Sequence, residues 1–137
     1  MSSESSIPNA PPPWSCKCTA YVLPFFTSSS TPLLNEKILA PLEAGSEAWT
    51  SEKLTGKHAG GVGFAQILRY SETPVGSYDE LVIIPGYFEA PEKVGCKGKH
   101  MRITGIWVSQ EATCMNGRKN WNIPKCVSFH GWLMTWC

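Results

Sequence analysis

The sequence has no strong excess of charge of either sign, because 12 lysines and arginines nearly balance 11 aspartates and glutamates, giving a formal net charge of +1. Nucleic acid and anionic membrane surfaces attract proteins with a clear basic excess, so we expect neither as a partner. Charged residues make up only 17% of the chain, whereas hydrophobic residues make up 42%. This balance excludes wholesale disorder and supplies enough apolar material for the core of one domain.

The sequence also lacks a run of about 18 apolar residues, the length that a membrane-spanning helix requires. The N-terminal segment from Met1 to Pro8 is polar and contains an acid, Glu4. It has neither the basic nor the apolar part of a secretory signal. Together these absences predict a cytoplasmic protein.

No disulfide or metal-binding pattern is evident among the six cysteines. Cys16 and Cys18 are too close in sequence to bridge comfortably, and no second pair of Cys or His follows at metal-ligand spacing. In a reducing compartment we therefore expect six free thiols, no metal and no other cofactor.

Glycine and proline are frequent, with 12 and 11 copies, which favours turns and strands over long helices. Apolar patterns predict strands at residues 62–70, 78–85 and 101–108, preceded by an extended segment at 21–26 that Pro24 interrupts. The sequence therefore predicts an α+β fold that is mostly β, with an antiparallel sheet or barrel.

A short helix is predicted at residues 110–116. Ser109 offers a hydroxyl for the N-cap, and Glu111 places an acid in the first turn. The pair Asn116-Gly117 would end this helix or form a tight turn. We expect one or two short helices in all.

Three segments in order resemble the acetoacetate decarboxylase-like proteins, in particular their fungal branch. They are Gly63 to Glu80, which ends in Tyr-Asp-Glu; Arg102 to Gln110; and Asn116 to Lys125, which contains Gly-Arg and ends in Pro-Lys. The resemblance covers residues 11–125 and implies part of a cone-shaped β-barrel with a few helices. It divides the chain into a flexible arm (1–13), the N-terminal portion of the family domain (14–125) and an atypical tail (126–137).

The chain departs from the family pattern in two places. Cys126 stands where the best-known enzymes of the family carry a second lysine, and residues 126–137 do not resemble the family's continuation. We therefore expect a truncated family member whose tail is foreign sequence.

The resemblance assigns Lys125 as a Schiff-base nucleophile. A neutral lysine amine condenses with a ketone to an iminium, which accepts the electron pair that decarboxylation releases. Trp121, Ile123 and Pro124 precede this lysine and are expected to exclude water from it. From the residues alone, a surface lysine beside a proline is the alternative.

Glu80 alternates onto the same strand face as Tyr78, Val82 and Ile84, and the resemblance places it in the active site. There it would shuttle a proton or orient the substrate; a solvated acid is the alternative. Tyr78 would line the pocket or belong to the core. Arg118 would bind a substrate carboxylate through two hydrogen bonds or form a structural ion pair.

The resemblance thus implies a decarboxylase, or a related imine-forming lyase, that acts on a small β-keto acid. The alternatives are a non-catalytic module that binds a small ligand and a truncated, inactive member of the same superfamily. The sequence leaves open whether the chain forms a homo-oligomer.

Overall fold

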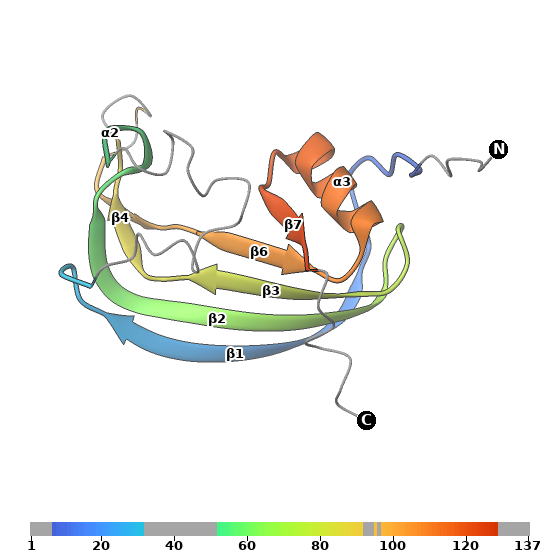
Figure 1. Cartoon of the computed structure of the whole chain (residues 1–137), viewed down its shortest axis with the longest axis horizontal. Coiled ribbons are helices and arrows are strands. Elements are labelled where there is room, and N and C mark those ends of the chain that lie inside the picture. Colours follow the sequence, from blue (N-terminus) through green and yellow to red (C-terminus); the bar gives the residue numbers. More distant parts are fainter. Residues whose placement is uncertain (1–6, 32–51, 92–94, 96, 129–137) are drawn as a thin grey trace.

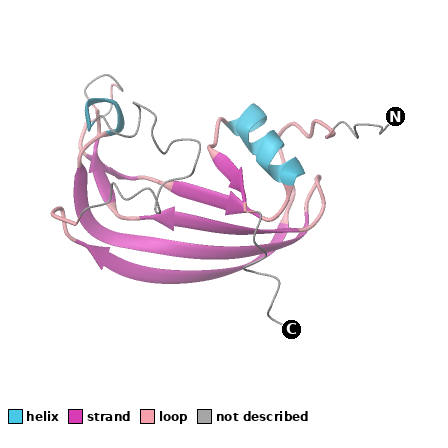
Figure 2. Ribbon diagram, in the orientation of Figure 1, coloured by secondary structure: helices cyan, strands magenta, loops and turns pink. Residues whose placement is uncertain are grey.

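The computed structural model describes residues 7–31, 52–91, 95 and 97–128. Most of this part of the chain forms a curved, open sheet of seven strands, and one helix covers one end of its inner face (Figures 1 and 2). The elements are β1 (Lys17–Thr27), α2 (Glu52–Thr55), β2 (His58–Glu72), β3 (Tyr78–Ile84), β4 (Tyr87–Glu89), β5 (Lys99–Met101), β6 (Gly105–Val108), α3 (Glu111–Trp121) and β7 (Lys125–Val127). The predicted mostly-β class is confirmed.

The sheet mixes antiparallel and parallel pairs. Its strand order is β5-β4-β2-β3-β6-β7, and β1 pairs with β2 outside this path. The neighbours are antiparallel except for β6 and β7, which run parallel. A parallel pair needs a crossover connection, and α3 supplies it, so the end of the helix returns the chain to the sheet at Lys125.

The core lies between the sheet and α3. Its buried cluster consists of Tyr78, Val82, Ile106, Val108 and Cys114. Side chains alternate between the two faces of a strand, so Glu80 lies on the same face as its neighbours Tyr78 and Val82. The side-chain alternation that the sequence predicts for this strand is therefore correct, and it directs Glu80 toward the helix.

Two predicted strand boundaries are wrong. Residues 101–108 form two separate strands, because β5 pairs with β4 whereas β6 pairs with β3. The chain changes partner in the intervening segment, where Ile103 is 44% exposed and Thr104 N donates a hydrogen bond to Ile83 O. Pro24 does not interrupt β1, which pairs only with β2 among the described strands and so tolerates a residue without an N–H.

The helix is also longer than predicted. The N-cap of α3 is Gln110, which makes no side-chain capping bond, and the helix ends at Asn122, whose φ of 52° is left-handed. The Ser109 hydroxyl instead accepts a hydrogen bond from Asp79 N at 2.8 Å. Asn116 and Gly117 lie inside the helix and are buried there, so their tertiary contacts outweigh their preference for turns.

The described part of the predicted N-terminal arm lies against α3. Asn116 Oδ1 accepts a hydrogen bond from Ala10 N at 2.7 Å, and Asn116 Nδ2 donates to Pro8 O at 3.0 Å. The Trp14 ring meets the Trp121 ring edge to face, with centroids 4.8 Å apart. Pro8, Ala10 and Trp14 of this segment therefore contact the helix, and the flexibility expected of residues 1–13 stays a prediction.

Cys126 and Val127, the first two residues of the predicted tail, belong to β7 and pair with β6. Cys16, Cys18, Cys114 and Cys126 are free thiols, while residues 129–137 and the remaining two cysteines lie outside the described residues. Within the part of the chain that the structure describes, no helix has the length and apolar character needed to cross a membrane.

Candidate functional site

A buried ion pair joins the two residues that the sequence analysis assigned to catalysis. Lys125 Nζ lies 2.7 Å from Glu80 Oε2, and the two side chains are only 10% and 8% exposed. Lys125 comes from β7 and Glu80 from β3, the strands on either side of β6. In the register of the sheet, Ile106 pairs with both Val82 and Lys125, so the lysine side chain crosses β6 to reach Glu80.

Two tyrosines border this ion pair. Lys125 Nζ lies 5.4 Å from the centroid of the Tyr78 ring, which stacks on the Tyr70 ring at 4.5 Å. Burial raises the pKa of Tyr78 to about 12, a hydrogen bond with Thr113 opposes this rise, and the charge of Glu80 adds to it. Burial also raises the pKa of Tyr70. Both phenols are therefore neutral near pH 7, and Tyr78 presents its ring face to the Lys125 amine.

Helix α3 contributes contacts that the sequence analysis missed. Lys125 Nζ donates a hydrogen bond to Thr113 Oγ1 at 3.3 Å. A Cβ added to Gly117 would lie 2.8 Å from Lys125 Cδ, so the glycine packs directly against the lysine side chain. The spacing of these two residues, four positions apart, is the signal that places them on one helix face.

Arg118 makes a different contact from the one expected of a substrate-binding residue. Its Nε donates a hydrogen bond to the main-chain oxygen of Lys125 at 2.8 Å, and the residue is exposed overall. In this structure Arg118 supports the strand that carries the lysine. The expectation that it binds a substrate carboxylate stays a prediction.

Ile123 and Trp121, two of the residues expected to exclude water from the amine, lie in different surroundings. Ile123 packs against the buried core cluster beside the site. Trp121 is 37% exposed and turns toward Trp14, so it does not shield the amine as expected. Burial of Lys125 comes mainly from the sheet and from α3.

Cys126 lies on the opposite face of the sheet from Lys125. The two residues are adjacent in β7, and Cys126 pairs with Trp107 whereas Lys125 pairs with Ile106 of the core cluster. Position 126 therefore lies on the face of the sheet opposite the Lys125 side chain.

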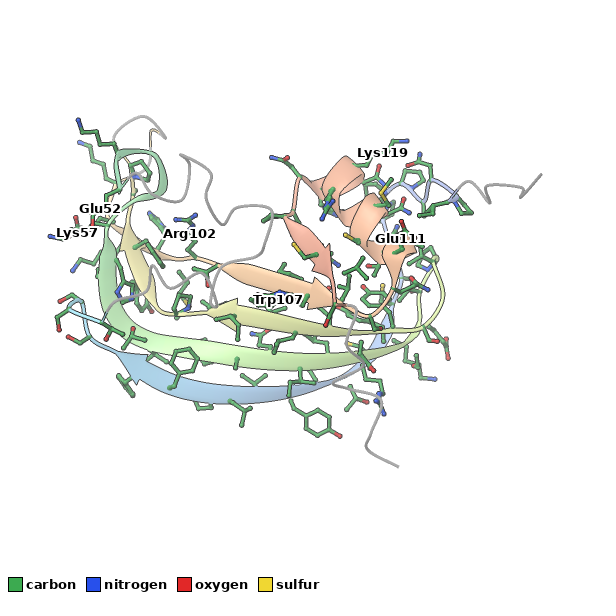
Figure 3. The ribbon with its side chains drawn as sticks, in the orientation of Figure 1. Glu52, Lys57, Arg102, Trp107, Glu111 and Lys119 are labelled. Carbon is green, nitrogen blue, oxygen red and sulfur yellow. The ribbon has the colours of Figure 1, made fainter. Side chains whose placement is uncertain are left out.

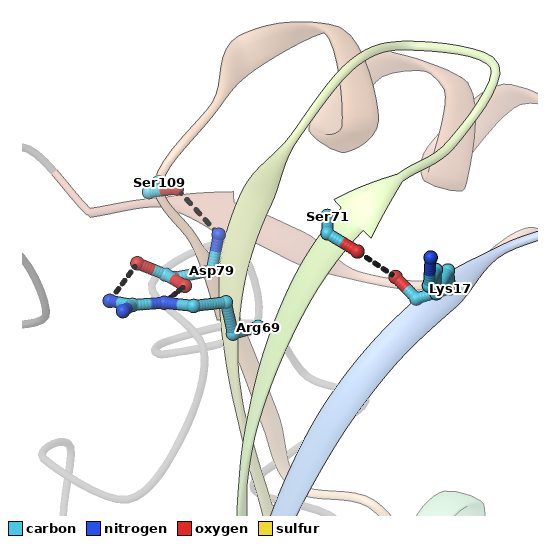
Figure 4. A network of polar contacts seen from close by, with 5 residues as sticks. All are labelled: Lys17, Arg69, Ser71, Asp79 and Ser109. Carbon is cyan, nitrogen blue, oxygen red and sulfur yellow. Dashed lines mark hydrogen bonds and ion pairs between the residues drawn. The ribbon is translucent and has the colours of Figure 1, made fainter.

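A polar network on the outer face fixes the strand that carries Glu80 (Figure 4). Arg69 donates two hydrogen bonds to the Asp79 carboxylate, at 2.9 Å and 3.3 Å, and Asp79 N donates one to the Ser109 hydroxyl. Because Asp79 and Glu80 are adjacent in β3, anchoring Asp79 outward directs Glu80 inward. Figure 3 shows the side chains of the surrounding elements, among which Trp107 of β6 and Glu111 and Lys119 of α3 are labelled.

Among the described residues, no group of three or more His, Cys, Asp or Glu side chains is arranged to hold a metal ion. The side chains that meet at the site carry an amine, a carboxylate, a hydroxyl and two phenols.

The raised pKa of Tyr78 predicts a loss of stability in alkali. An unfolded tyrosine ionises near pH 10, whereas Tyr78 in the fold ionises at about 12. The stabilisation is therefore complete below about pH 10 and is lost as the pH rises toward 12. We expect urea unfolding at increasing pH to show a shallower fall in the free energy of unfolding for Tyr78→Phe than for the parent. Tyr21→Phe, at a side chain 62% exposed, should keep the parent's slope; equal slopes in all three proteins would contradict the assignment.

Comparison with known proteins yields no relative: no protein-family model, no curated protein and no solved structure matches this chain.

Proposed function

We propose that this chain carries an acetoacetate decarboxylase-like domain, and that Lys125 forms an imine with a small β-keto acid during carbon–carbon bond cleavage. In this proposal the open sheet belongs to a cone-shaped β-barrel. The observation that carries the proposal is the contact between Lys125 Nζ and Glu80 Oε2 at 2.7 Å, between side chains that are nearly excluded from water.

Glu80 prepares the amine for reaction. An ammonium group has no lone pair, so the proton on Lys125 must leave before the nitrogen can attack a carbonyl. Glu80 Oε2 lies 2.7 Å from Lys125 Nζ, and in this proposal it accepts that proton as a general base.

The reaction then follows from imine chemistry. The amine attacks the ketone of the β-keto acid to give a carbinolamine, which takes up one proton from solvent and loses water to give an iminium. The bond between the α-carbon and the carboxylate breaks, CO2 leaves, and the electron pair moves to the iminium nitrogen to form an enamine. Glu80 returns its proton to the α-carbon, and water hydrolyses the resulting iminium to free the ketone and Lys125. Tyr78 and Tyr70 would line the pocket for the apolar part of the substrate.

Reductive trapping tests this proposal. The chain is incubated with acetoacetate and sodium borohydride, and peptides are mapped by mass spectrometry. We expect a stable adduct on Lys125 and none in Lys125→Arg, which keeps a cation beside Glu80 but cannot form an imine. Labelling spread over exposed lysines, or no adduct at all, would overturn imine formation at this site.

The ion pair also supports a second interpretation, because a buried lysine and glutamate can join β3 and β7 in a purely structural role. The chain would then be a non-catalytic module that binds a small ligand, or a truncated and inactive member of the superfamily. Retained binding of acetoacetate without an adduct would indicate the module, and neither binding nor adduct would indicate the inactive product. Release of CO2 separates decarboxylation from other imine chemistry.

A further inference from the structure

One face of α3 contacts Lys125 along its whole length. Thr113, Cys114, Gly117 and Arg118 lie at positions i, i+1, i+4 and i+5, a spacing that places side chains on the same side of a helix. Each of the four contacts a different part of the lysine or holds its backbone in place. We refer to these four residues as the lysine clamp.

The base of the lysine is held through its main chain. Cys114 Sγ donates a hydrogen bond to Lys125 O at 3.2 Å, and Arg118 Nε donates to the same oxygen at 2.8 Å. A carbonyl oxygen has two lone pairs, so the two donors account for both acceptor positions. This arrangement ties the start of β7 to the helix and sets the direction in which the lysine side chain leaves the strand.

The stem of the lysine lies across Gly117. A Cβ at this position would approach Lys125 Cδ to 2.8 Å and Cε to 3.1 Å. Any other residue would force the stem to move or the helix to shift. The absence of a side chain at position 117 therefore lets the stem pack directly against the helix.

The tip of the lysine is held by Thr113, which is 0% exposed. Its hydroxyl accepts a hydrogen bond from Lys125 Nζ at 3.3 Å. The same hydroxyl acts to lower the pKa of the Tyr78 phenol, against the larger effect of burial. Thr113 thus adds a polar contact to the amine from the helix, in addition to the ion pair with Glu80 from the sheet.

We propose that the lysine clamp orients Lys125 and that Thr113 is its positioning residue. Thr113 fixes Nζ between Glu80 and the face of Tyr78. A free lysine side chain has many accessible rotamers, so a single ion pair would leave the amine able to move. The purpose of the clamp rests on the proposed imine chemistry, since a nucleophile reacts fastest when it is already oriented. Its existence does not depend on that chemistry.

The first test uses nuclear magnetic resonance without any substrate. In protein with 13C-labelled lysine, the two Cε protons of a clamped Lys125 should be inequivalent and shifted by the Tyr78 ring, and Lys125→Arg identifies the signals. Thr113→Val should move both signals toward the single position of exposed lysines, whereas Thr113→Ser should retain the parent pattern. Thr104→Val is the matched control, because Thr104 is buried but hydrogen-bonds Ile83 O instead. An unchanged pattern in Thr113→Val would overturn the proposal.

The second test separates the clamp from the proposed function. Thr113→Val should slow reductive trapping by acetoacetate about tenfold or more, because small misplacements of reacting groups have large effects on rate, and Thr113→Ser should restore it. If trapping is absent in every variant but the resonances respond as expected, imine chemistry fails and the clamp stands. If trapping occurs equally in all variants, Thr113 does not position the amine. Should Thr113→Val fail to fold, Thr113→Cys replaces it, with weakened inequivalence expected and an unchanged pattern contradicting the clamp.

Discussion

Replacing Lys125 with methionine alone is expected to lower the free energy of unfolding by about 3–5 kcal/mol, because the substitution leaves the Glu80 carboxylate buried without its charged partner. Methionine preserves most of the apolar volume, so the loss comes from the unpaired charge. The double substitution Glu80→Leu/Lys125→Met removes both charges and should recover most of that loss. Urea unfolding of the parent, both single variants and the double variant measures the coupling between the two positions.

An exposed ion pair offers the matched control. Lys17 Nζ lies 3.1 Å from Glu72 Oε1, with both side chains more than two-thirds exposed, and exposed pairs contribute at most about 1 kcal/mol. Lys17→Met should therefore change stability far less than Lys125→Met. If the double variant is no more stable than Lys125→Met, the buried charge is not the cause of the loss.

Replacing Gly117 with alanine is the second large expected effect. Alanine favours the helix by about 1 kcal/mol in isolation, yet its Cβ would lie 2.8 Å from Lys125 Cδ, and overpacking of this kind costs about 1–3 kcal/mol. We expect net destabilisation, together with a loss of reductive trapping at Lys125 of about tenfold or more as the amine moves from its position. Urea unfolding and peptide mapping of the trapped adduct measure the two effects.

Met115→Ala is the control for Gly117→Ala, because Met115 lies in the same helix and is 49% exposed. It should leave trapping at Lys125 unchanged. A Gly117→Ala variant that is more stable than the parent and is trapped at the same rate would contradict this prediction. It would show that the lysine stem can move aside without loss, and that Gly117 does not help to position it.

The strand that carries Glu80 was predictable because its apolar residues alternate. Tyr78, Val82 and Ile84 recur at every second position around Glu80, and this pattern alone determines which face of the sheet they share. Local chemistry decides this alternation, so the sequence predicts it well.

The extent of α3 was not predictable in the same way. Asn116-Gly117 favours a turn by local preference, but Asn116 is buried by contacts with residues more than 100 positions earlier. Gly117 is buried by Lys125, which lies in strand β7 after the helix. Contacts between distant parts of the chain outweighed local propensity here, and no window of the sequence around the helix contains them.

The contact between Lys125 and Glu80 could not be predicted from the pattern of residues either. The sequence pattern assigned both residues to one site only through a family resemblance. What brings them together is the parallel alignment of β7 with β6 and the antiparallel alignment of β6 with β3. Strand order and direction arise from the packing of the whole sheet, and alternation within a single strand does not reveal them.

The parallel pairing of β6 and β7 has a consequence for how the protein matures. An antiparallel hairpin forms its side-chain contacts as soon as its turn closes, but a parallel pair must wait for its connecting element to fold and dock. We therefore expect Lys125 to meet Glu80 only after α3 has packed on β6. Until then both charges would remain in water, so the buried ion pair is expected to form in one of the last steps of assembly.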